Sequence, residues 1–290
     1  MQNILDISKK EFIYGAHLAS LISPSLVLSA QILLNLEINY IYIAIAYLIT
    51  LIIYSYNYQK EFDTDFITNP EKVTYLEKRK KYYPFIMVFY IVLLLFLTSF
   101  VFNPGFVMFV LLILVGGILY TLIFKILTKD IPGFKSLYIT SIYAYATTFF
   151  IISYYALNLN LLIITIFLLV FIKMFIAVVY FDIKDMESDS IENLKTLPNI
   201  LGKKNTIILL SILNIIQLLM VLYSIYVNIL PLFSISFVLL FCYTEYYLIR
   251  AMNANPKKML FYSYIMVDGE FAIWVVVLII SKAIYYHLIL

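Results

Sequence analysis

The chain has 290 residues and a mass of 33.9 kDa; 64% of its residues are hydrophobic and only 13% are charged. Soluble domains are about half apolar and a quarter charged, so this composition excludes a soluble globular fold and a disordered chain. The net charge of +3 is too small to indicate a nucleic-acid partner, and the single cysteine, Cys242, excludes an internal disulfide framework. Such a chain is expected to fold in a lipid membrane.

Uncharged apolar stretches of about 20 residues are typical of helices that cross a hydrocarbon core. The sequence predicts nine of them, at 12–35, 38–57, 82–102, 105–124, 137–157, 160–181, 206–227, 230–250 and 260–282. Polar or Pro/Gly breaks, such as Asn103-Pro104-Gly105, divide the longest apolar runs into two spans each. A membrane barrel is disfavoured because its ten-residue alternating segments are missing from the sequence. We therefore expect an all-α membrane protein with a single domain over residues 1–290.

The basic residues are distributed unevenly among the connections between these spans. The N-terminus and the connections 2–3, 4–5, 6–7 and 8–9 hold 18 of the 20 Lys and Arg residues, and the other connections hold none. Basic loops stay on the cytoplasmic side of a membrane. The sequence thus predicts a multi-pass protein of the cell membrane, with its N-terminus and long loops in the cytoplasm and its C-terminus outside.

Acidic residues concentrate where the second and sixth predicted spans end. The first acidic motif is Asn57, Glu61 and Asp65, and the second acidic motif is Asp182, Asp185 and Asp189. Spacings of three and four place the members of each motif on one helix face, provided that the helix continues past the membrane surface. Glu61 and Asp65 precede Asp185 and Asp189 by the same 124 residues, which favours two pseudo-repeats of four helices.

Carboxylates stacked in this way repel one another unless a cation lies among them. Oxygen ligands suit a hard divalent ion, and Mg²⁺ in particular uses one or two carboxylates together with phosphate oxygens of a substrate. Two acidic motifs that face each other would therefore hold a diphosphate through bridging metal ions. A zinc site has no support, because the sequence has two histidines, far apart, and one cysteine.

Three further stretches complete the pattern. Residues 182–185 read Asp-Ile-Lys-Asp, residues 195–198 read Lys-Thr-Leu-Pro, and residues 131–135 read Ile-Pro-Gly-Phe-Lys. Together with the first acidic motif and Asn69-Pro70, they resemble the UbiA-type intramembrane prenyltransferases over essentially the whole chain. Glu61 departs from that family's pattern, which has Asp at this position.

The resemblance implies a bundle around a central cavity and transfer of an isoprenoid chain from a prenyl diphosphate to a hydrophobic acceptor, either aromatic or lipid. It implies Mg²⁺ as the cofactor, held by both acidic motifs, with Asp65, Asp185 and Asp189 as the catalytic members. Lys135 and Lys195 lie in the stretches that resemble the family and are predicted to bind the diphosphate as point charges. Membrane lipid is the other expected partner.

The sequence leaves open the roles of several polar side chains inside the spans. The candidates for lining the cavity are His17, Tyr54, Lys173 and Tyr180. Glu245, Asp268 and Glu270 are acids within spans, and they either partner Lys173 and Arg250 or form a polar pocket for an acceptor head group.

Two other functions fit parts of the pattern. A related membrane enzyme would ionise a prenyl diphosphate and cyclise it without a second substrate. A transporter would use the intramembrane charges as its pathway, but the chain has only seven glycines to break its helices, and its acids gather at one membrane face.

Overall fold

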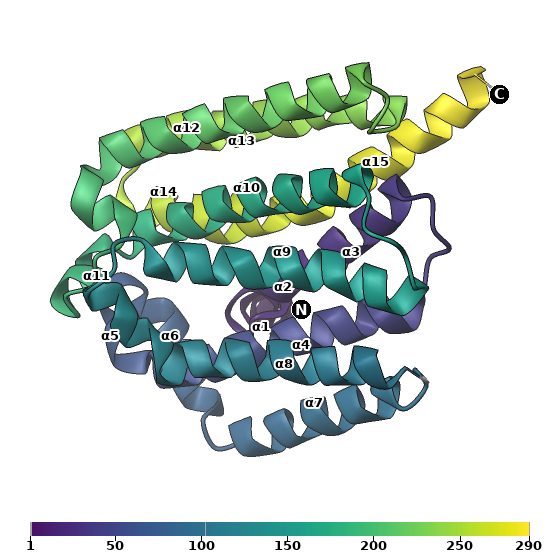
Figure 1. Cartoon of the computed structure of the whole chain (residues 1–290). Helices are drawn as coiled ribbons and strands as arrows, with labels where there is room; N and C mark the ends of the chain where they lie inside the picture. The colour runs from purple at the N-terminus through teal and green to yellow at the C-terminus, as the bar shows by residue number, and fades with distance from the viewer. Residues whose placement is uncertain (1, 102, 290) are drawn as a thin grey trace.

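The structure, a computed structural model, describes residues 2–101 and 103–289, with side chains described for all of these except residues 2–5, 63, 64, 288 and 289. This part of the chain is folded into helices without a strand. Figure 1 shows the long helices lying side by side, with the short helices α5 and α11 near one end of the bundle. The prediction of an all-α protein is confirmed.

The elements follow one another along the chain in this order. The first half contains α1 (Gln2–Tyr14), α2 (His17–Ser20), α3 (Ile22–Leu33), α4 (Tyr40–Lys60), α5 (Phe62–Thr68), α6 (Pro70–Arg79), α7 (Tyr83–Thr98), α8 (Pro104–Leu122) and η1 (Phe124–Lys129). The second half contains α9 (Phe134–Tyr155), α10 (Leu161–Lys184), α11 (Met186–Ile191), α12 (Leu197–Tyr226), η2 (Leu232–Ser236), α13 (Phe237–Met252), α14 (Pro256–Phe261), η3 (Tyr262–Val267) and α15 (Asp268–Ile289).

The number of membrane-spanning helices depends on how two bent pairs are counted. In the described part, seven helices are long and apolar enough to cross a membrane, and the number rises to nine if each bent pair forms one span. Asp6–Tyr14 meets His17–Leu33 at 52°, and Pro70–Arg79 meets Tyr83–Thr98 at 83°. The chain is a multi-pass membrane protein, and the count of nine stays a prediction.

Helices begin at the polar breaks in the sequence. The side chains of Asn39, Asn103 and Asn160 accept hydrogen bonds from the backbone N–H groups three residues later, at 3.0, 3.1 and 2.9 Å. Each of these bonds satisfies a donor that the first turn of a helix leaves free, which is costly in lipid. Pro104 occupies the first turn of α8, where its missing N–H costs nothing.

Some predicted spans differ from the helices found. The first predicted span, 12–35, is interrupted by the left-handed conformation of Ala16, with φ of 69°. The predicted span 206–227 is the later part of α12, which begins at Leu197 and kinks at Gly202, where φ is 77°. The ninth span includes a π-helical segment, η3, whose wider turns interrupt the regular helix just before Asp268. Apolar periodicity does not reveal such irregularities.

A buried aromatic cluster closes the bundle at the end remote from α5 and α11. Tyr42, Phe106 and Phe150 are at most 2% exposed, and their ring centroids are 5.1 to 5.6 Å apart. These rings lie near the start of α4, the start of α8 and the end of α9. The cluster fills the interior at this end with aromatic rings, whereas both acidic motifs lie at the other end.

Candidate active site

Both acidic motifs are built on the same local irregularity. Helix α4 ends where Glu61 adopts φ −103° and ψ 20°, and α10 ends where Asp185 adopts φ −97° and ψ 9°. Each break is followed at once by a short helix, α5 or α11. The condition for a one-face arrangement, that each helix continues past the membrane surface, is therefore not met, because the helix breaks in the middle of each motif. The matching breaks, 124 residues apart, agree with the hypothesis of two pseudo-repeats.

The loop before α9 places a lysine below the second acidic motif. Gly133 has φ of 68°, and its N–H donates to the carbonyl of Lys195 at 2.9 Å, while the N–H of Lys195 donates to the carbonyl of Thr128 at 2.8 Å. A side chain at residue 133 would be strained at this φ and would press on Leu197. These backbone bonds fix the first turn of α9, from which Lys135 points at the carboxylates.

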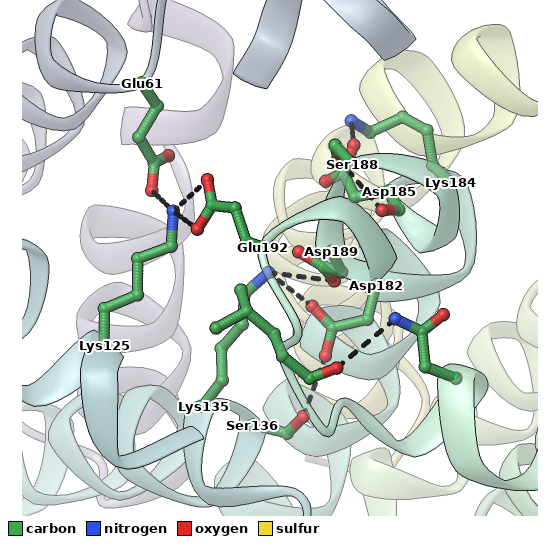
Figure 2. Close-up of polar contacts among 12 residues, drawn as sticks. Glu61, Lys125, Lys135, Ser136, Asp182, Lys184, Asp185, Ser188, Asp189 and Glu192 are labelled. Atoms are coloured by element: carbon green, nitrogen blue, oxygen red, sulfur yellow. Dashed lines mark hydrogen bonds and ion pairs between the residues drawn. The ribbon is translucent and has the colours of Figure 1, made fainter. Parts of the chain in front are cut away.

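Lys135 is the cation at the centre of the second motif (Figure 2). Its Nζ lies 2.7 Å from Oδ1 of Asp182 and 3.7 Å from Oδ2 of Asp189. Ser136 donates to Oδ2 of Asp182 at 2.9 Å. Asp182 and Asp189 are 0% and 6% exposed. Two buried carboxylates thus share a single, half-buried ammonium.

The first motif is held by other lysines. Lys125 bridges Glu61 and Glu192, with Nζ–Oε distances of 3.0 and 2.9 Å, as Figure 2 shows. Lys72, which is buried, lies 2.6 Å from Oδ2 of Asp65. Asn57 accepts a hydrogen bond from Thr121.

The two motifs meet across α5 and α11. Thr68 donates to Oδ1 of Asp185 at 3.3 Å, and Lys184 also contacts this carboxylate. Helices α5 and α11 pack against each other, so the equivalent short helices of both halves lie side by side. The structure therefore brings together the two motifs that the sequence separates by more than a hundred residues.

A cavity of about 150 Å³ lies between the motifs. Its polar lining comes from Asn57, Glu61, Asp65, Lys72, Lys135, Asp182, Lys184, Asp185 and Asp268, and its aromatic lining from Tyr54, Tyr58, Tyr120, Phe181 and Tyr264. Asp189 lies behind this wall, within reach of Lys135. The cavity combines cations, carboxylates and aromatic faces at one place in the bundle.

A second, apolar chamber of about 100 Å³ adjoins the cavity. The two spaces share four lining residues, Tyr54, Asn57, Tyr120 and Ile139. The chamber runs between α3, α4, α8 and α9 and reaches Phe150 of the aromatic cluster. Gly117 faces Ile53 so closely that a Cβ atom would clash with it, at 2.4 Å. A polar head and an apolar tail of one molecule would find separate compartments here.

The donor set fits a hard cation. In the described part of the chain, no three His, Cys, Asp or Glu side chains stand close enough together to hold a metal ion as they are. Oδ1 of Asp182 and Oδ2 of Asp189 are buried, and their contacts with Lys135 lack the alignment of a hydrogen bond, so lone pairs stay unused. One or two carboxylates per ion are what Mg²⁺ requires when phosphate oxygens complete its shell.

The protonation of the second motif reflects this crowding. Burial raises the pKa of Asp189 to about 7; the Lys135 ammonium opposes the shift, and the carboxylates of Asp182 and Asp185 add to it. Burial acts on Asp185 in the same direction, but Lys184 and Lys135 outweigh it and hold the pKa of that carboxyl below its ordinary value. Neighbouring carboxyls of one motif therefore titrate apart.

Of the four candidates for cavity lining, the structure places only Tyr54 in the cavity. His17 contacts the hydroxyl of Tyr47 at 2.7 Å and does not line the cavity. Tyr180 is fully buried against Tyr247, with ring centroids 5.1 Å apart. Helical spacing alone did not reveal that these side chains point into packed interfaces.

Lys173 lies in a separate pocket of about 30 Å³ and pairs with Glu270, and Glu245 accepts a hydrogen bond from Asn214 at 2.9 Å. Lys195 is exposed, and its backbone, through the bonds to the loop before α9, is its link to the site. The remaining intramembrane acid, Asp268, lines the cavity.

Sequence reasoning singled out Asp268 as a possible pocket acid, but it did not identify Lys72, Lys184 and Tyr264 as residues of the site. Lys184 lies within the second motif, and Lys72 follows Asn69-Pro70, so both were visible as motif neighbours. The side chain of Asn69 donates to the Tyr264 hydroxyl at 3.1 Å, which ties the first-motif loop to η3. No local pattern links residues 69 and 264.

These features define a multi-pass helical membrane protein with a carboxylate- and lysine-lined cavity that adjoins an apolar chamber. The model of the UbiA prenyltransferase family matches residues 18–276, and the chain belongs to this family. No curated protein matches it.

Solved structures resemble the whole chain at low sequence identity. A UbiA homologue from Archaeoglobus fulgidus bound to GPP and Mg²⁺ has a TM-score of 0.64 at 13% identity, with 95% of this chain and 99% of that chain covered. A digeranylgeranylglyceryl phosphate synthase has a TM-score of 0.56 at 15% identity, covering 96% and 98%. An apo UbiA homologue from Aeropyrum pernix K1 has a TM-score of 0.59 at 12% identity, covering 91% and 95%. These likenesses show a shared fold.

Proposed function

We propose that the chain is an intramembrane prenyltransferase that moves an isoprenoid chain from a prenyl diphosphate to a hydrophobic acceptor, either aromatic or lipid. The observation that carries the proposal is the junction of a charged cavity with an apolar chamber through shared lining residues. A diphosphate suits the first space and an isoprenoid tail the second. The A. fulgidus homologue, described as bound to GPP and Mg²⁺, supports this choice of donor.

The carboxylates of both acidic motifs would hold Mg²⁺. When bound, the ion supplies positive charge that neutralises the leaving diphosphate. Lys72, Lys135 and Lys184 each pair with a motif carboxylate, so they already stand where phosphate oxygens would arrive. They would donate to these oxygens when a diphosphate occupies the cavity.

The aromatic lining supplies the other requirement of the reaction. Breaking the allylic C–O bond leaves a carbocation, which aromatic faces stabilise and which water destroys. Lys72 already lies over the Tyr58 ring, with Nζ 3.3 Å from the ring centroid, so this ring accepts a cation in the folded protein.

The distribution of basic residues supports an active site that faces the cytoplasm, with the C-terminus outside. Reporter fusions after Asn103, Asn158 and Asn228 test this orientation, and each should report the outer side. A cytoplasmic signal from any of the three would contradict it.

The test of the activity uses purified protein with Mg²⁺ and radiolabelled prenyl diphosphates of increasing length, first alone and then with panels of aromatic and lipid acceptors. We expect Mg²⁺-dependent release of diphosphate and a labelled, acceptor-dependent product. The matched control is Asp185→Asn, which removes one negative charge at nearly constant volume. Labelled cyclic product without any acceptor would indicate the terpene cyclase instead, and the absence of Mg²⁺-dependent release with every donor would refute both enzymes.

A further inference from the structure

Asp268 is a buried carboxylate that neither acidic motif contains. It is the first residue of α15, it directly follows the π-helical segment η3, and it is 2% exposed. Its side chain lines the cavity. In the part of the chain that the structure describes, no side chain hydrogen-bonds to it or lies within ion-pair distance of it.

Glu270, two residues later, has the hydrogen-bond partners that Asp268 lacks. Glu270 is fully buried, and it accepts hydrogen bonds from Lys173, from Thr244 at 2.6 Å and from the Tyr247 hydroxyl at 3.0 Å. A buried carboxylate without such partners costs stability and is retained for what it does.

The lysines that share the cavity with Asp268 are already engaged elsewhere. Lys72 and Lys184 line the same cavity as Asp268. Lys72 lies 2.6 Å from Asp65, and Lys184 contacts Asp185. Asp268 is therefore left as an acceptor with free lone pairs that face the cavity.

Asp268 lines the cavity together with Tyr54 and Tyr58. Tyr54 lines both the charged cavity and the apolar chamber, and Tyr143 lines the chamber and bonds to Tyr54 at 3.1 Å. Asp268 thus lies at the junction where the head of a prenyl diphosphate gives way to its tail.

We propose that Asp268 is the proton acceptor of the reaction; this rests on the proposed function. The allylic C1–O bond breaks, and its electron pair leaves with the diphosphate. A lone pair or π pair of the acceptor forms the new bond to C1. The proton that the acceptor then carries passes to the Asp268 carboxylate, which releases it to water when the product leaves. If no acceptor is used, the same carboxylate removes a proton from the carbocation and yields a neutral terpene.

The experiment separates ionisation from proton removal in one reaction. Asp268→Asn, Asp268→Glu and Asp65→Asn are incubated with Mg²⁺, radiolabelled geranylgeranyl diphosphate and the acceptor that the wild-type protein uses. Released diphosphate and deprotonated product, either prenylated acceptor or terpene, are measured together.

We expect Asp268→Asn to keep releasing diphosphate, with water capturing the cation as prenyl alcohol, and to lose about 10²-fold of its deprotonated product, the usual contribution of a general base. Asp268→Glu should recover part of that product. Asp65→Asn should lose both signals together.

An unchanged yield of deprotonated product per diphosphate in Asp268→Asn would overturn the proposal, whether total turnover falls or not. Folding is checked by thermal stabilisation with Mg²⁺ and a thio analogue of the donor, which Asp268→Asn should retain. Failure of the wild-type protein to release diphosphate from any donor would instead refute the proposed function.

Discussion

Charged side chains are buried in two regions of this bundle, and the regions are built differently. Between α10, α13 and α15, Lys173 faces one carboxylate, Glu270, and both are completed by Thr244 and Tyr247. Five carboxylates and three lysines line the cavity, a fourth lysine, Lys125, pairs with Glu61 from outside this lining, and Asp268 has no direct partner among the described residues.

The two regions show how a charge network that stabilises the fold differs from one that forms a functional site. The Lys173 network is neutral and satisfied, so it holds three helices together in a setting where an unpaired charge is expensive. The cavity carries unbalanced negative charge, which favours the arrival of cations and is the property of a site. Burial of a charge in a membrane therefore does not by itself identify a functional residue, whereas a missing partner does.

Breaking the Lys173 pair should give the largest change in stability. Glu270→Gln leaves Lys173 as an unpaired buried charge, and removing one partner of such a pair costs about 3–5 kcal/mol. Denaturant titration of the detergent-solubilised protein measures this loss, and Lys173→Met in the same chain should recover most of it. Turnover per folded molecule should stay at the wild-type value; a specific loss of turnover would place this pair in the site.

Removing a motif carboxylate should act chiefly on turnover, unlike breaking the Lys173 pair. Asp65→Asn and Asp185→Asn should each lower turnover by about 10²–10³-fold, as expected when one electrostatic stabiliser is lost from a reaction site. Each variant also leaves a buried lysine, Lys72 or Lys184, without the carboxylate it pairs with, so the metal-free fold should lose stability as well. Thermal stabilisation by Mg²⁺ with a non-hydrolysable prenyl diphosphate should disappear in both variants. Its persistence would mean that these acids do not hold the diphosphate.

A change of pH should alter fold stability and Mg²⁺ affinity through the acidic motifs, and it should not act through the Lys173 network. Because the folded pKa of Asp189 is about 7 and its ordinary value is 3.8, the metal-free fold loses stability as pH rises from about 4 to 7. Mg²⁺ needs the ionised carboxylate, so its apparent affinity should rise about tenfold between pH 6 and pH 8. Mg²⁺ titrations followed by thermal stability measure this, and Asp189→Asn should flatten the dependence.

The smallest expected effect concerns the two lysines predicted to bind the diphosphate, whose variants should differ in donor KM. Lys135 lines the cavity, whereas the Lys195 side chain is exposed. Lys195→Met should change donor KM by no more than about twofold, the scale of surface substitutions. Lys135→Met should raise it clearly more, measured under identical Mg²⁺. Equal effects of both variants would support a role for Lys195 in binding the diphosphate.

The fold class and the acidic motifs were predictable because their signals are local. Hydropathy reports the spans, and the spacing of carboxylates reports the chemistry of the site. Which face a side chain takes is set by neighbours far along the chain. Hydropathy therefore left open whether Lys173 lines the cavity or pairs with an intramembrane acid, and it gave no sign of Lys72. The π-helical segment η3, directly before Asp268, likewise leaves no mark in composition or periodicity.

The two backbone hydrogen bonds between the loop before α9 and the loop before α12 have a consequence for biosynthesis. Gly133 and Lys195 are 62 residues apart, so a growing chain inserts α9 and α10 before these bonds close. Lys135 is made long before Asp182 and Asp189, and until they emerge its ammonium stays with water at the membrane surface. Because domains form as the chain is made from its N-terminus, the site matures late. A translation intermediate shorter than about two thirds of the protein has most of the lysines of the site and no means to position them.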